Sequence, residues 1–178
     1  MKGKIRLIGL SLIAALAISG CATSKPLAAR GPETVFPSIE AAAVDALTYT
    51  YLQAKSERNL ERMRAGTIYS VGTGYSYGEI HVASSLLVYR ITYPLKPQDV
   101  ARFHMYPSAT GYDNELENEW ASQPDRRSVA VTDPLHRPLF ILHPSLVIRE
   151  YRGRDDAVVT VADLRRPKRV TLIAGELD

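Results

Sequence analysis

The pattern of apolar and polar residues divides the chain into three parts. Residues 7–18 form an apolar run that only Gly9 and Ser11 interrupt. In contrast, residues 22–36 have no apolar period and contain two prolines and a glycine. Regular periodicity begins at Pro37. Because a polar, proline-containing stretch without periodicity is typical of a linker, the sequence predicts a leader at residues 1–20, a flexible tether at 21–36 and one globular domain at 37–178.

The domain is predicted to begin with a helix. Apolar residues recur at helical spacing over residues 39–54, and the positions of this stripe are mostly alanine. Ser38 is a plausible N-cap, and Glu40 lies in the first turn, where a negative charge suits the helix dipole. An alanine-rich face favours close packing, so we expect this helix to lie against a sheet.

From Gly66 onward the period shortens to that of β-strands, and β-branched and aromatic residues become frequent. Interpreting Gly72-Thr73-Gly74 as a hairpin loop places Tyr69, Tyr75 and Tyr77 on one face. A short acidic helix is expected at residues 114–121. The sequence therefore predicts an α+β domain with a mainly antiparallel or mixed sheet, one long N-terminal helix packed on it and a short second helix. The expected strands cover residues 67–71, 75–82, 86–93, 100–106, 128–132, 139–142, 147–151, 157–161 and 170–174.

The leader has the features of a bacterial lipoprotein signal peptide. Basic residues at positions 2, 4 and 6 precede the apolar run, which is shorter than the roughly 20 residues that a membrane-spanning helix needs. Cys21, the only cysteine of the chain, follows Ile18-Ser19-Gly20, and this sequence resembles a lipobox. The resemblance implies that the Cys21 sulfur receives a diacylglycerol, with acyl chains such as palmitate as the membrane anchor. The alternatives are an ordinary cleaved secretory signal and a buried N-terminal helix.

Removal of the leader changes how the charge of the chain is interpreted. The full sequence has 22 basic and 19 acidic residues, but three of the basic residues belong to the leader. The mature chain is therefore formally neutral, and we expect no nucleic-acid partner. Ala22 follows the cysteine in place of the aspartate that usually retains lipoproteins in the inner membrane, so the resemblance implies the periplasmic leaflet of the outer membrane.

Two parts of the domain sequence resemble an uncharacterised bacterial family found at the ends of Rhs-repeat proteins, which is similar to the JAB/MPN metal-dependent isopeptidase fold. One part is Phe36-Pro37-Ser38-Ile39-Glu40-Ala41-Ala42-Ala43, followed by the strand expected after residue 64. The other is a strand that ends at His104, a variable loop, a short helix, and strands near residues 129–133 and 139–142. The resemblance extends over about residues 36–151 and implies a JAB-like fold.

A JAB-type zinc site uses an H-x-H pair at a strand end, a serine and an aspartate farther on, and an upstream glutamate. Alternation along the strand brings both imidazoles to one side, where they leave zinc an open position for water. This sequence keeps His104 but has Tyr106 at the second histidine. The family's spacing assigns the serine position to Asn114 and the aspartate position to Glu117, and Glu79 is the candidate for the upstream glutamate.

Tyrosine is a poor zinc ligand at neutral pH because its pKa is about 10, so the metal motif is degenerate. We therefore expect a lipid-anchored, periplasm-facing, non-catalytic binding or structural module without a cofactor, whose partner is another envelope protein. The first alternative is a zinc-dependent hydrolase with a rearranged site formed by His104, Glu117 and Glu79. The second alternative is an immunity or inhibitor lipoprotein. The carboxylates at 115, 117 and 119 beside Trp120 also fit an exposed acidic helix better than a glycosidase pair.

Overall fold

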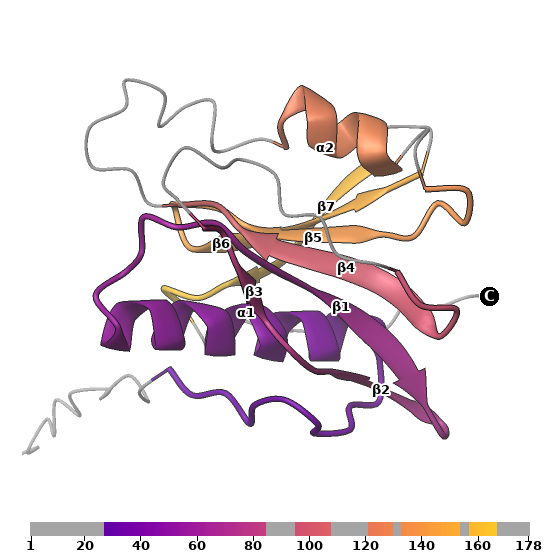
Figure 1. The fold of residues 1–178 in the computed structure, drawn as a ribbon, viewed down its shortest axis with the longest axis horizontal. Helices are drawn as coiled ribbons and strands as arrows, with labels where there is room; N and C mark the ends of the chain where they lie inside the picture. Colours follow the sequence, from indigo (N-terminus) through magenta and orange to yellow (C-terminus); the bar gives the residue numbers. More distant parts are fainter. Residues whose placement is uncertain (1–26, 85–94, 108–120, 130–132, 154–156, 167–178) are drawn as a thin grey trace, which may run out of the picture.

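A mixed β-sheet with helix α1 (Ile39–Ser56) on one face and helix α2 (Gln123–Arg127) on the other forms the domain (Figure 1). The computed structural model describes residues 27–84, 95–107, 121–129, 133–153 and 157–166. Within these residues the strands follow the order β2-β1-β4-β5-β6-β7, and β3 also pairs with β1. The bounds are β1 Arg64–Val71, β2 Gly74–Tyr77, β3 His81–Val82, β4 Asp99–Met105, β5 Leu139–Leu142, β6 Val147–Arg152 and β7 Ala157–Asp163.

Helix α1 begins where the sequence predicts. The Ser38 hydroxyl accepts a hydrogen bond from the Ala41 N–H at 3.1 Å, and Glu40 and Lys55 place opposite charges at the two ends of the helix dipole. Ala42, Ala43 and Ala46 have no exposed surface, because this small-residue face lies directly on the sheet. Its contacts are mainly with β4, the strand that carries His104.

The hairpin of β1 and β2 has a register that differs from the expected one. Val71 pairs with Gly74, so Gly72 and Thr73 alone form the turn, and Gly72 adopts the positive φ of 56° that glycine tolerates. Tyr77 therefore lies opposite Ile68 and faces α1, whereas Tyr69 points to the other side of the sheet. The prediction that the three tyrosines share one face is wrong.

Strands β4 and β5 pair in parallel, and the pleat gives each strand two buried faces. Phe103 on β4 and Phe140 on β5 belong to the core beneath α1. Ile141 and Tyr106 belong to a second, smaller core on the opposite face of the sheet. Helix α2 lies on that face (Figure 1). The sheet is therefore covered on both faces at the end of β4, which is the region of the candidate site.

The remaining predictions have mixed outcomes. The α+β class with a mixed sheet is confirmed, and β5, β6 and β7 lie at the predicted positions. Ser128 and Val129 continue from α2 in helical conformation instead of beginning a strand. Cys21 and the leader lie outside the described residues, as do the segments expected at 86–93, 114–120 and 170–174. The described residues contain no helix that is long and apolar enough to cross a membrane.

Candidate functional site

The end of β4 and the start of α2 bring together the polar residues of the candidate site. His104 and Tyr106 are two residues apart on β4 and its continuation, so both side chains project to the face opposite α1, and their ring centroids are 4.9 Å apart. Ser122 is the N-cap of α2, and Asp125 lies in its first turn. Serine and aspartate are common there because their oxygens accept hydrogen bonds from free backbone N–H groups. We call these four residues the His104 cluster.

The Asp125 carboxylate is the acceptor at the centre of the cluster. Its Oδ2 accepts a hydrogen bond from the Tyr106 hydroxyl and another from the Ser122 hydroxyl at 2.5 Å. The Tyr106 oxygen in turn accepts a hydrogen bond from the Ser122 backbone N–H at 2.8 Å. Burial and the adjacent carboxylate raise the pKa of Tyr106, so its hydroxyl stays protonated at neutral pH and continues to donate to Asp125.

His104 is the member of the cluster with an unused polar atom. Its residue is 7 % exposed, and its Nε2 has no hydrogen-bond partner among the described residues, although Oδ2 of Asp125 lies 3.8 Å away. Burial lowers the pKa of His104, and this effect outweighs the attraction of Asp125 for the charged form. The imidazole is therefore neutral at neutral pH.

Two further buried aromatic residues extend the cluster toward β6. The ring of His143 lies 5.6 Å from that of Tyr106, and its Nε2 is 3.1 Å from the Tyr151 hydroxyl. The Tyr151 oxygen also accepts the Ala121 backbone N–H at 3.0 Å. These contacts hold the chain just before α2 against the sheet, so His143 and Tyr151 position the segment that carries Ser122 and Asp125.

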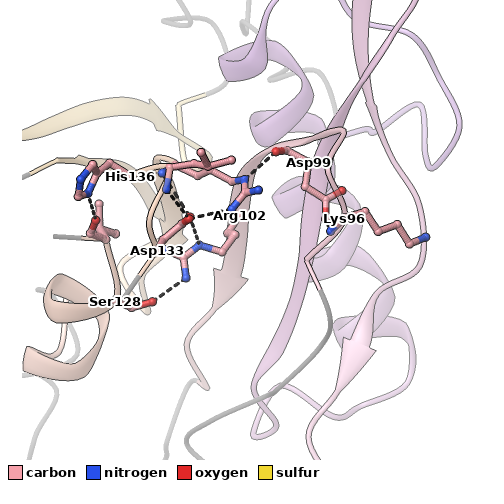
Figure 2. A network of polar contacts seen from close by, with 9 residues as sticks. Lys96, Asp99, Arg102, Ser128, Asp133 and His136 are labelled. Carbon is pink, nitrogen blue, oxygen red and sulfur yellow. Dashed lines mark hydrogen bonds and ion pairs between the residues drawn. The ribbon is translucent and has the colours of Figure 1, made fainter. Parts of the chain in front are cut away.

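A second polar network, drawn in Figure 2, adjoins the cluster. Asp133 is 3 % exposed, and its Oδ1 lies 2.8 Å from Nη1 of Arg137, while its Oδ2 lies 3.9 Å from Nε of Arg102. Nη1 of Arg102 donates to the hydroxyl of Ser128 at the end of α2, and Nε of Arg137 donates to the Asp99 carbonyl at 2.7 Å (Figure 2). One buried carboxylate thus faces two guanidinium groups that connect α2, β4 and the segment before β5.

Of the sequence-predicted site residues, the structure describes His104 and Glu79, which lie apart from each other. His104 lies in the cluster just described, but Glu117 and Cys21 lie outside the described residues. The Glu79 side chain is 82 % exposed and lines a cavity whose lining does not include His104. The carboxylate that the structure brings to His104 is that of Asp125.

The described residues do not fit a zinc ion. They contain no group of three His, Cys, Asp or Glu side chains close enough to hold a metal. The third group beside His104 and Asp125 is the phenol of Tyr106, which keeps its proton and donates a hydrogen bond to the carboxylate. A protonated phenol is not a zinc ligand, and a carboxylate oxygen that already accepts two hydrogen bonds is a weak zinc ligand.

The roles of Ser122 and Asp125 beside His104 were not predicted from the sequence. A fixed count from Tyr106 assigned the serine and aspartate positions to residues 114 and 117, and it passed over the serine and aspartate that are three apart at 122 and 125. The S-x-x-D spacing together with the helix N-cap that it predicts was the available signal. Loop length is not fixed by local spacing, so only the fold showed which pair adjoins His104.

Comparisons of this chain with protein-family models, with curated proteins and with solved structures found no match in any of the three. Its functional interpretation therefore depends on two kinds of observation. One is the sequence of residues 1–21, which predicts a leader and a lipidated Cys21. The other is the geometry of the described side chains, above all the His104 cluster.

Proposed function

We propose that the mature protein is a lipid-anchored, periplasm-facing module that binds another envelope protein and has no catalytic activity of its own. The observation that carries the non-catalytic part is the hydrogen bond from the Tyr106 hydroxyl to Asp125. It places a protonated phenol where a metal-binding site at the end of β4 would need a second imidazole. The chain order of α1, β1, β4, α2 and β5 supports a JAB-like fold whose metal site has been replaced by a closed polar cluster.

The closed cluster has a structural consequence that supports a binding role. Tyr106, Ser122 and Asp125 satisfy one another through hydrogen bonds, and Tyr151 fixes the backbone at Ala121. Hydrogen bonds among these buried groups stabilise one arrangement of the chain, although Nε2 of His104 in the same cluster has no hydrogen-bond partner among the described residues. The start of α2, where Gln123 and Pro124 are exposed, is thereby fixed against the sheet, and a pre-organised surface lowers the entropic cost of binding. We therefore place the partner-binding surface over this end of the sheet.

Metal content and hydrolysis test the proposal directly. We expect the full chain, purified in detergent and incubated with zinc sulfate, to retain well under one zinc per protein after desalting, because the four residues of the His104 cluster offer one imidazole and one carboxylate that already accepts hydrogen bonds. We also expect no cleavage of peptide or isopeptide substrates. Elemental analysis and mass spectrometry of the substrates measure both. One tightly held zinc together with cleavage would instead establish the hydrolase alternative, to which the unpaired Nε2 of His104 would then contribute.

The anchor is tested by a single substitution. We expect Cys21→Ser to abolish incorporation of labelled palmitate and to move the protein from the membrane pellet to the soluble or unprocessed fraction. Several acyl chains make attachment effectively permanent, since each buried CH₂ contributes about 0.8 kcal/mol, and the substitution removes the sulfur that carries them. Ser19→Ala, which leaves the cysteine in place, is the control. Unchanged labelling of Cys21→Ser would contradict lipidation at this residue.

A further inference from the structure

A cavity of about 370 Å³ lies away from the His104 cluster and shares no lining residue with it. Six segments contribute to it: the chain before α1, strand β1, the connection from β2 to β3, strand β3, the chain leading into β4, and the first residue of β4. Its volume is within the range of small-molecule sites, which begins at about 300 Å³. The residues that line it are Glu33, Thr67, Tyr69, Gly78, Glu79, His81, Lys96, Gln98 and Asp99.

The charge in this cavity is predominantly negative. Three of the lining residues, Glu33, Glu79 and Asp99, have carboxylates, and one, Lys96, has an ammonium group. Oδ2 of Asp99 accepts the Lys96 backbone N–H at 2.7 Å, whereas Figure 2 shows the Lys96 side chain extending away from Asp133 and Arg102. The formal charges of these four side chains sum to −2.

The position of Glu33 is defined by the fold. Its backbone N–H donates to the Tyr77 carbonyl at 2.9 Å, and its Oε2 accepts the Tyr69 hydroxyl at 2.8 Å. The φ of Glu33 is 64°, a left-handed conformation that is uncommon outside glycine. The hydrogen bond from the Tyr69 hydroxyl therefore holds the carboxylate at the cavity wall, where its negative charge attracts cations.

Gly78 keeps this wall open. A Cβ at this residue would lie 3.2 Å from Oε1 of Glu33 and 3.8 Å from Cε1 of Tyr69. The φ of Gly78 is not in the left-handed region, so the backbone conformation does not itself require glycine. The missing side chain instead leaves space directly in front of the Glu33 carboxylate and the Tyr69 ring.

We propose that this cavity binds an organic cation, a guanidinium or ammonium group on a short apolar stem such as the side chain of a basic residue. The cationic group lies against Glu33, Glu79 and the Tyr69 ring, and the Thr67 and Gln98 side chains offer additional hydrogen-bonding groups. A charged hydrogen bond to a carboxylate gives such a ligand more affinity than its neutral isostere has. The proposal requires neither the lipid anchor nor a particular role of the His104 cluster.

The test uses n-butylguanidinium and its neutral isostere n-butylurea as probes, with the full chain in detergent and ligand-observed NMR titration. We expect n-butylguanidinium to bind with a Kd of about 1 mM at low salt, which corresponds to about 4 kcal/mol, and n-butylurea to bind at least tenfold more weakly. Added salt should weaken the binding because the lining is open to solvent.

Three variants locate the site. We expect the double variant Glu33→Gln/Glu79→Gln to weaken n-butylguanidinium binding about tenfold and Gly78→Ala to weaken it severalfold. Glu61→Gln, an exposed carboxylate outside the lining, should leave the Kd within twofold. Far-ultraviolet circular dichroism verifies that each variant is folded. Equal binding of the two probes, no saturable binding up to about 50 mM, or an equal loss in Glu61→Gln overturns the proposal.

Discussion

Replacing Asp133 by alanine is expected to destabilise the domain by about 3 to 5 kcal/mol. The carboxylate is buried, and it accepts hydrogen bonds from Nη1 and the backbone N–H of Arg137 and from the Leu135 backbone N–H. Without it, the guanidinium groups of Arg137 and Arg102 remain in the protein interior without their shared counter-charge. Such a loss is a large part of the free energy of unfolding of a typical domain, which is about 5 to 15 kcal/mol.

Urea denaturation followed by circular dichroism measures the effect. With a slope of about 2 kcal/mol per molar, the midpoint should fall by about 2 M. Asp133→Asn should lie between the wild type and Asp133→Ala, because the amide oxygen still accepts hydrogen bonds but carries no charge.

Asp163→Ala is the matched control. Asp163 also pairs with an arginine, Arg165, but this pair lies at the surface, so its loss should cost at most about 1 kcal/mol. If Asp133→Ala costs no more than Asp163→Ala, the network of Figure 2 does not stabilise the fold in the way inferred here.

Tyr106→His is expected to create a zinc site that the wild type lacks. Nε2 of His104 and Oδ2 of Asp125 are 3.8 Å apart, and two ligands on a tetrahedral zinc ion are about 3.4 Å apart. A few tenths of an ångström of movement therefore suffices. The substitution supplies a second imidazole and also removes the hydroxyl that occupies Asp125. We expect a zinc Kd in the micromolar range or tighter, at least 100-fold below that of the wild type.

Competition with a chromophoric chelator measures the zinc affinity, and the visible spectrum of the cobalt form reports tetrahedral geometry. Tyr106→Phe is the control, because it frees Asp125 but adds no ligand. The double variant Tyr106→His/His104→Ala should lose the site again. If Tyr106→His binds zinc no more tightly than Tyr106→Phe does, the interpretation of the His104 cluster as a degenerate metal site is untenable.

Local patterns predicted the elements well where one signal dominates. The alanine stripe with Ser38 as N-cap predicted α1, and the buried apolar run at Leu139–Leu142 predicted β5. The hairpin shows where local reasoning fails. Its glycines mark a turn, but whether Gly74 belongs to the turn or to β2 decides the register, and a one-residue shift moves Tyr69 to the opposite face from Tyr77.

The candidate site shows the same limit over a longer distance. The alternation of His104 and Tyr106 was evident in the sequence, and the structure places both on one face. Their partner Asp125 was not predicted, because the segment between β4 and α2 has no periodicity that fixes its length. His143 and Tyr151 reach the cluster from the end of β5 and from β6 through sheet pairing that no local pattern specifies.

The sequence by itself determined the features that depend on neighbouring residues. These are helix α1 and the α+β class. The leader with Cys21 and the formally neutral mature chain stay predictions from the sequence. Tertiary structure decided the contacts between distant segments: Asp125 beside His104, Asp133 between two arginines, and Glu33 beside Tyr69 in the cavity. The physical reason is that helix caps and apolar periods arise from interactions within a few residues. Ion pairs and cavities arise only when packing brings distant side chains together and removes water from them.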